Sequence, residues 1–231
     1  HIFGYELSLA GWAWELRQTL TAADASTGDF FGESVALDSD TALIGAFSAP
    51  SPHTVGSPGA VYAFGESSGT WTETAKITAE DGIGTDRFGG AVALDGEFFV
   101  TGNSLDDDGG DDAGAAYAYG LNGGAWSLQE KLRASIGPFE DEYGQSVAVG
   151  EVFAVVGAPE NDEAAYNAGS AYVFAEDAGQ WAMVQQLFAG DAASSDRFGS
   201  AVSIDGDRIV IGARYRDEGA TQTGAAHVFA G

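Results

Sequence analysis

The chain of 231 residues contains no cysteine, so it has neither a disulfide framework nor a reactive thiol, and its redox compartment stays open. Its longest apolar runs have the length of a strand and fall far below the roughly 20 residues that cross a bilayer as a helix. No signal peptide is recognisable at the start. We therefore expect a soluble protein without direct membrane insertion, whose stability comes from packing, ring closure or bound ions.

Positive charge is also scarce. There are 9 Lys and Arg residues against 35 Asp and Glu residues, which gives a net charge of -26, and Lys76 and Lys131 are the two lysines. This charge repels nucleic acids and anionic membrane surfaces, so both are excluded as partners. It suits a protein that stays hydrated in concentrated salt, and we expect a halophilic or marine source. The chain starts at His1 rather than at methionine, as a processed secreted protein would.

What the chain does contain is one pattern, W…FG…G-A…G-A-x-Y, repeated four times. Its tryptophans lie 57, 55 and 55 residues apart and are Trp14, Trp71, Trp126 and Trp181. A repeat of this length that is rich in strand-forming residues predicts an all-β fold, a β-propeller of four four-stranded blades. The repeats cover about residues 14–70, 71–125, 126–180 and 181–231. We expect a single domain over residues 12–231, with residues 1–11 as an N-terminal extension or arm.

The second repeat shows how one blade is built. Residues 90–95 and 97–102 form a hairpin through the Asp95-Gly96 turn, residues 115–119 give a third strand, and residues 126–132 give a fourth. Small and branched residues alternate along the first strand of every repeat. Each sheet is thus thin on one face and bulky on the other, which places this strand innermost. The Trp and the FG aromatic are expected to pack between neighbouring sheets.

The two ends of the chain complement each other in this scheme. The last repeat stops after a third strand at residues 225–229, and the chain begins with a fourth strand at residues 14–20. We predict that the N-terminal strand, residues 14–20, completes the last blade and closes the ring, because closure removes exposed sheet edges.

These motifs resemble the FG-GAP repeat family, the propeller repeats of integrin α-subunits and of many secreted bacterial and archaeal proteins. The resemblance covers about residues 12–231 and rests on the FG dipeptides and on one complete GAP element, Gly157-Ala158-Pro159. The FG positions are Phe31-Gly32, Phe88-Gly89, Tyr143-Gly144 and Phe198-Gly199. Relatives commonly have seven blades, so four repeats leave three alternatives: closure as four blades, a larger ring shared by two chains, or a fragment of a longer propeller.

An acidic, glycine-rich loop at residues 105–112 is the first candidate site. Its carboxylates are Asp106, Asp107, Asp108, Asp111 and Asp112, and calcium takes six to eight oxygen ligands. The alternative is a solvated loop adapted to salt. Calcium loops of the integrin type lie between the first two strands of a blade, where this chain has short turns, so sites of that type are not supported.

A second candidate set recurs in every repeat. Asp29, Asp86, Asp141 and Asp196 stand two residues before the FG aromatic, and Asp24, Asp81 and Asp191 stand five residues earlier, with Ile136 breaking the series. These carboxylates either pin turns by accepting backbone N–H bonds or coordinate cations. In a propeller the loops before the first strand and after the second emerge on the same face. Both acidic sets should therefore gather there.

Catalytic motifs are missing from the sequence. His1, His53 and His227 stand in unrelated contexts, and no serine or carboxylate belongs to a recognisable nucleophile motif. We expect no enzyme, and a propeller hydrolase or lyase ranks last. The leading hypothesis is a non-enzymatic extracellular or cell-surface adhesion module, which binds a protein or glycan through its acidic loop face with the assistance of calcium. The alternative is a structural subunit that assembles with copies of itself into a surface layer, fibre or appendage.

Overall fold

The computed structural model describes residues 2–8, 11–52, 56–110, 112–133, 141–217 and 220–231. These residues form seventeen β-strands and no helix, so the described chain offers no helical segment capable of spanning a membrane. The prediction of an all-β fold is confirmed.

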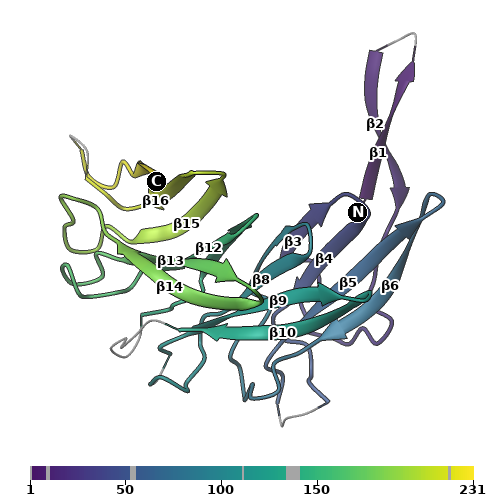
Figure 1. Cartoon of the computed structure of the whole chain (residues 1–231), viewed down its shortest axis with the longest axis horizontal. Coiled ribbons are helices and arrows are strands. Elements are labelled where there is room, and N and C mark those ends of the chain that lie inside the picture. The colour runs from purple at the N-terminus through teal and green to yellow at the C-terminus, as the bar shows by residue number, and fades with distance from the viewer. Residues whose placement is uncertain (1, 9–10, 53–55, 111, 134–140, 218–219) are drawn as a thin grey trace.

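Four antiparallel sheets follow one another in chain order and form an open arc (Figure 1). The first sheet contains β3 (Ser34–Asp38), β4 (Thr41–Ala46), β5 (Ala60–Ser67) and β6 (Thr70–Ile77). The second contains β7 (Ala91–Asp95), β8 (Phe98–Asn103), β9 (Ala115–Asn122) and β10 (Ala125–Leu132). The third contains β11 (Ser146–Gly150), β12 (Phe153–Ala158), β13 (Ser170–Asp177) and β14 (Gln180–Leu187). The fourth contains β15 (Phe198–Asp205), β16 (Arg208–Ala213) and β17 (Ala225–Ala230).

The hydrophobic core lies at the junctions, which are the contacts between consecutive sheets. The first strands β3, β7, β11 and β15 pack against one another in chain order, as predicted for innermost strands. At the junction of the first and second sheets, Leu43 and Val61 meet Phe99 and Tyr117, and all four side chains are buried. The other two junctions are built in the same way. The sheets thus stabilise one another by burying apolar surface.

The FG aromatics occupy equivalent places in these cores. Each ring packs edge-on against the residue two positions into the third strand, at centroid distances of 5.2 to 5.4 Å. The pairs are Phe31 with Tyr62, Phe88 with Tyr117, Tyr143 with Tyr172, and Phe198 with His227. Edge-to-face packing is a favoured geometry for aromatic pairs, which explains why the repeat keeps a ring at both positions.

Glycine is required where one sheet approaches the next. A Cβ added to Gly102 at the end of β8 would lie 1.8 Å from the carbonyl oxygen of Gly144 in the third unit. Gly45 and Gly157 are obstructed in the same way by backbone oxygens of the following unit, at 2.0 and 2.1 Å. The glycine of the repeated G-A element therefore lets two backbones approach closely, which no other residue permits.

The prediction that residues 14–20 close the ring is wrong for this structure. The strand β2 (Gly11–Gln18) pairs with β1 (Ile2–Ser8), and this hairpin projects away from the four sheets (Figure 1). Trp14, predicted to be core, is 70% exposed, whereas its equivalent Trp181 is 6% exposed. In the described chain no strand pairs with the outer edge of β17.

Two physical reasons account for this outcome. A partner only a few residues away costs little loop-closure entropy, so β1 takes the hydrogen-bonding edge that β17 was expected to use. The end of β2 is also fixed beside the first sheet, because the Gln18 side chain exchanges two hydrogen bonds with the backbone of Trp71, at 2.8 and 2.9 Å. Beyond it, Leu20 and Ala22 are buried against the first sheet.

Candidate functional site

Two sets of loops meet on one face of the arc, which we call the loop face. One set precedes the first strand of each sheet, and the other joins the second strand to the third. In every unit the carbonyl of the Asp before FG accepts a backbone hydrogen bond from the second set. The N–H donors are Ser48, Leu105, Glu160 and Tyr215, for Asp29, Asp86, Asp141 and Asp196 respectively. Both acidic sets therefore lie on the same face.

The side chains of these four aspartates are buried. Asp29, Asp86 and Asp196 each accept a hydrogen bond from the backbone N–H three residues earlier, at 2.7, 2.8 and 2.9 Å. The fourth, Asp141, accepts from the side-chain amide of Asn161 at 2.9 Å. Such bonds fix the turn that leads into each sheet.

Burial raises the pKa of Asp86 and of Asp141 to about 6. In Asp86 the hydrogen bond from Ile83 opposes this effect, while the nearby charge of Asp106 adds to it. At Asp141 the amide of Asn161 opposes it. Both groups carry a charge at neutral pH that the surrounding protein solvates poorly.

The residue between this Asp and FG has a left-handed backbone conformation in every unit. It is Phe30, Arg87, Glu142 or Arg197, with φ values of 56°, 69°, 50° and 55°. This region is costly for residues other than glycine, and it persists where the surrounding structure determines it. Here the pinned Asp on one side and the packed FG aromatic on the other impose it. The conformation repeats, whereas the side chain differs in charge and size.

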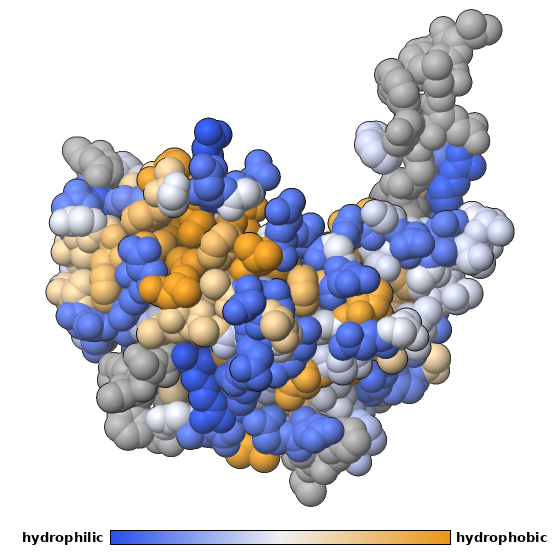
Figure 2. Space-filling model, in the orientation of Figure 1, coloured by the Kyte–Doolittle hydropathy of each residue, from blue (hydrophilic) through white to orange (hydrophobic). Residues whose placement is uncertain are grey.

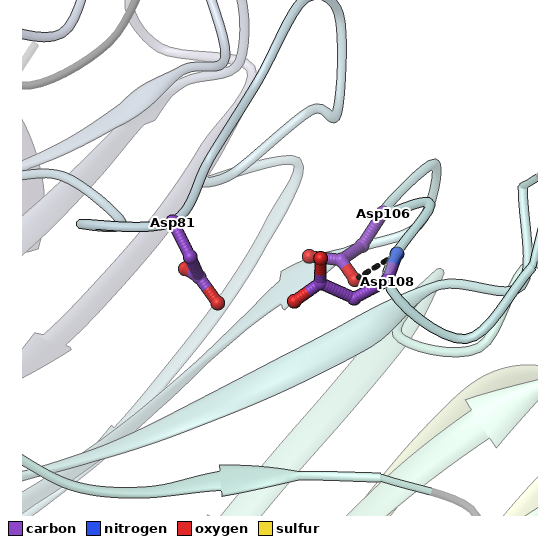
Figure 3. A group of neighbouring side chains, drawn as sticks. All are labelled: Asp81, Asp106 and Asp108. Atoms are coloured by element: carbon purple, nitrogen blue, oxygen red, sulfur yellow. Dashed lines mark hydrogen bonds between the residues drawn. The ribbon is translucent and has the colours of Figure 1, made fainter.

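Asp81, Asp106 and Asp108 come together in the second unit (Figure 3). One oxygen from each lies within 4.8 Å of the others, and the backbone N–H of Asp108 donates to Asp106 at 3.1 Å. The ammonium group of Lys131 on β10 contacts all three carboxylates, at 2.7, 2.8 and 2.8 Å. The cluster thus contains its own cation.

The protonation states of this cluster follow from its geometry. Burial alone would lower the pKa of Lys131, but hydrogen bonds to the three carboxylates raise it. The same ammonium lowers the pKa of Asp108. Asp106, the most buried of the three with a side chain 3% exposed, also accepts hydrogen bonds from Tyr117 and Asn103, at 3.1 and 3.0 Å. Lys131 therefore stays charged and neutralises a buried carboxylate.

Two other units place a fixed cation on the equivalent aspartate. Lys76 on β6, at the position that corresponds to Lys131, binds Asp24 at 2.7 Å and lowers the pKa of that carboxyl. In the fourth unit Arg216 binds Asp191 at 2.5 Å and Asp196 at 3.1 Å. Both lysines of the chain thus serve this purpose. Their equivalent positions in two repeats are the sequence signal for this pairing.

Two further members of the predicted metal set are not part of this cluster. Asp107 and Asp112 are exposed, and the backbone N–H of Asp112 donates to the Asp107 side chain at 2.9 Å, which closes the loop. Asp111 lies outside the described residues, as do His1 and His53. The third histidine, His227, replaces the tyrosine of the other units in the aromatic pair with Phe198.

A pocket of about 290 Å³ opens where the four units converge. We call it the shared pocket, and its lining includes Glu33, Phe47, Arg87, Ser104, Gln145 and Arg214. Arg87 lies over the ring of Phe47 at 5.4 Å, and Arg214 lies over Tyr215 at 4.9 Å. Neither guanidinium group forms a hydrogen bond or ion pair with the described part of the chain.

The neighbouring Arg197 is different, because Glu160 binds it at 2.5 Å. Burial and Glu160 raise the pKa of Glu142, while Arg197, Arg87 and Arg214 oppose this rise. Three guanidinium groups thus act on one carboxyl group. Arg197 and Arg216 thus form ion pairs within the chain, whereas the guanidinium groups of Arg87 and Arg214 form none in the described residues.

The FG-GAP repeat family model matches residues 14–64, 71–119, 126–174 and 181–229, which is most of the chain. The chain belongs to the FG-GAP repeat family. FG-GAP repeats are typical of extracellular, adhesion-type modules, and the family is generally non-enzymatic. Comparison with curated proteins finds no match.

The matched FG-GAP repeats do not coincide with the sheets. A repeat begins at the Trp of an outermost strand and ends in the third strand of the next sheet, so the second repeat, for example, joins β6 to β7, β8 and β9. The second, third and fourth repeats therefore each link two neighbouring sheets covalently, whereas the first begins in β2 of the N-terminal hairpin. Because the loop that precedes each first strand is part of that link, the same segment builds the junction and the loop face.

Proposed function

We propose that this FG-GAP protein is a non-enzymatic interaction module, located outside the cell or at its surface, that binds a protein or glycan through the loop face. One observation carries the proposal. The backbone of the loop face is repeated, but the side chains that line the shared pocket differ from unit to unit. Repeated positions serve the scaffold, so varied side chains on a fixed backbone are where recognition is expected.

Electrostatics indicates the kind of group that binds. The chain carries a net charge of -26, yet two arginines without an internal ion pair in the described chain line the shared pocket. Their guanidinium groups present several N–H donors in a fixed plane, which suits a carboxylate. A ligand carboxylate, from an acidic side chain or an acidic sugar, would replace the pairing that Arg87 and Arg214 lack. Glu33 in the same pocket opposes more highly charged anions.

Calcium assistance is the finer part of the proposal, and it centres on Asp81, Asp106 and Asp108. Their oxygens are the donor type that calcium prefers. An ion there has to displace the Lys131 ammonium, so calcium binding requires the Lys131 side chain to move away from the three carboxylates. Thermal unfolding with calcium or with chelator, at fixed ionic strength, tests this. An unchanged midpoint argues against calcium assistance, because a ligand that binds only the native state raises it.

Binding itself is tested on immobilised glycans, neutral and acidic, and on extracellular matrix proteins. The test variant combines Arg87→Ala with Arg214→Ala, and the control is Arg208→Ala, an exposed arginine in the β15–β16 hairpin. Loss of binding in the double variant alone supports the shared pocket. Equal binding by both variants would rule the pocket out as the recognition site, and no binding to any of these probes would speak against the module itself.

A further inference from the structure

The two ends of the arc expose sheet faces whose equivalents are covered elsewhere in the chain. On the first sheet the bulky residues of β3, Val35 and Leu37, are 69% and 62% exposed. Their equivalents in the second sheet, Val92 and Leu94, are partly buried against the first sheet. A groove of about 480 Å³ follows this free face, lined by Leu20, Phe31 and Ile44 together with Val35 and Leu37.

The fourth sheet shows the opposite half of a junction. Val210 on β16 and Val228 on β17 are 41% and 70% exposed. The equivalent residues of the first sheet, Leu43 and Ala63, are fully buried at the junction with the second sheet. Figure 2 shows apolar side chains gathered over the end of the molecule where the fourth sheet lies.

The glycines show the same difference. In the second unit a Cβ on Gly89 or Gly102 would collide with the backbone of a neighbouring unit, at 2.4 and 1.8 Å. Gly32 in the first unit would meet nothing within 4 Å of its added Cβ in the described chain, and Gly212 in the fourth would meet only Ala201, at 3.7 Å. The two ends thus keep the close-approach glycines of a junction, but no described backbone approaches them.

We infer that a second copy of this chain covers these faces, with the fourth sheet of one copy packing on the first sheet of the next. The two free faces are the two halves of a junction that the chain already forms three times, so each copy carries the surface that fits the other. The contact is heterologous, because different surfaces meet. Two copies that satisfy both faces make a closed ring, and copies that satisfy one face each make an open chain.

Charge determines when this association occurs. Each copy carries a net charge of -26, so copies repel one another at low ionic strength. Salt shortens the range of that repulsion while apolar burial at the junction persists. Association should therefore rise with the concentration of sodium chloride. This dependence distinguishes the junction from attachment through surface ion pairs, which salt weakens.

The experiment is sedimentation velocity on the whole chain across a series of protein and salt concentrations. The test variants are Val35→Lys and Val228→Lys, which place a charge on one free face each without touching a buried residue. The control is Leu128→Lys on β10, an equally apolar residue that is 49% exposed and lies on neither free face. Circular dichroism spectra confirm that all three variants fold.

A heterologous contact makes one specific prediction for mixtures. Each test variant alone should lose the ring or chain, because one face is blocked. An equal mixture of the two should form a heterodimer, since Val35→Lys keeps the fourth-sheet face and Val228→Lys keeps the first-sheet face. The inference is overturned if the unmodified chain stays monomeric at high salt and high concentration. It is also overturned if Leu128→Lys disrupts association as strongly as the test variants, or if the mixture forms no heterodimer.

Discussion

Replacing Gly102 by alanine is the sharpest test of how the sheets approach one another. The new methyl group would lie 1.8 Å from the oxygen and 2.9 Å from the carbon of the Gly144 carbonyl. Both atoms belong to the backbone, so the second and third sheets have to separate. Overpacking costs about 1–3 kcal/mol, while replacing glycine restricts the unfolded chain and returns about 0.4–1 kcal/mol. We expect a net loss of about 1–2 kcal/mol or more in the free energy of unfolding.

Gly212→Ala is the matched control, because Gly212 occupies the same position in the fourth sheet. Its added Cβ meets only Ala201, at 3.7 Å, which is ordinary van der Waals contact. Without a clash, only the restriction of the unfolded chain affects stability, and the free energy of unfolding of this variant should rise by up to about 1 kcal/mol. The two identical substitutions thus change stability in opposite directions.

Urea unfolding followed by circular dichroism measures both effects, at a protein concentration low enough to keep the chain monomeric. Equal destabilisation by the two alanines would refute the reasoning, because it would mean that the fourth sheet is covered in the monomer and that the ring closes within one chain. At high concentration and high salt, Gly212→Ala should instead weaken association. A second copy would then bring its backbone to that glycine.

Three further predictions concern other parts of the molecule. Lys131→Met leaves a buried carboxylate without its cation and should lower the free energy of unfolding by about 3–5 kcal/mol. Calcium should partly restore the lost stability in a melting experiment. Arg133→Met, which removes an exposed pair, should lower it by about 1 kcal/mol or less. The pKa of Asp141 is raised from 3.8 to about 6, so between these pH values the native state holds a proton that the unfolded state releases. The free energy of unfolding should therefore fall as pH rises from about 4 to 6. Asp141→Asn should flatten that slope when unfolding is measured at several pH values. In urea unfolding, Trp181→Ala should lower the free energy of unfolding by about 3–5 kcal/mol, because Trp181 is buried. Trp14→Ala should lower it by about 0.5 kcal/mol or less, because Trp14 is exposed. An equally large loss for Trp14→Ala would show that this side chain is buried in solution.

Much of the fold could be predicted because each local signal agreed with the repeat. The Asp95-Gly96 turn and the alternation along β7 give the same hairpin in the structure. Closure was different, because it depends on a competition between two partners for one strand. Nothing in residues 14–20 distinguishes β17 from β1, and the nearer partner and the Gln18 contact with Trp71 decide the outcome.

The position of the candidate site could be predicted from the sequence, but the contacts among its side chains could not. The spacing placed both acidic sets on one face, because loop positions follow from strand order. The cation in the cluster was missed, since Lys131 lies on an outermost strand, 25 positions from Asp106 in sequence. A contact between residues so far apart in sequence leaves no local pattern from which it can be predicted. The ion pair of Arg197, and the absence of one at Arg87 among the residues that the structure describes, depend on side-chain directions that no spacing rule supplies.

The left-handed residue before FG has an evolutionary consequence. Its backbone shape is held by neighbours on both sides, and phenylalanine, arginine and glutamate all adopt it there. Selection for folding acts on the aspartate and the aromatic, while selection for recognition can act on the residue between them. Duplicating such a unit copies a scaffold whose surface chemistry is free to diverge. Binding preferences can therefore change one unit at a time, without a new fold having to be found.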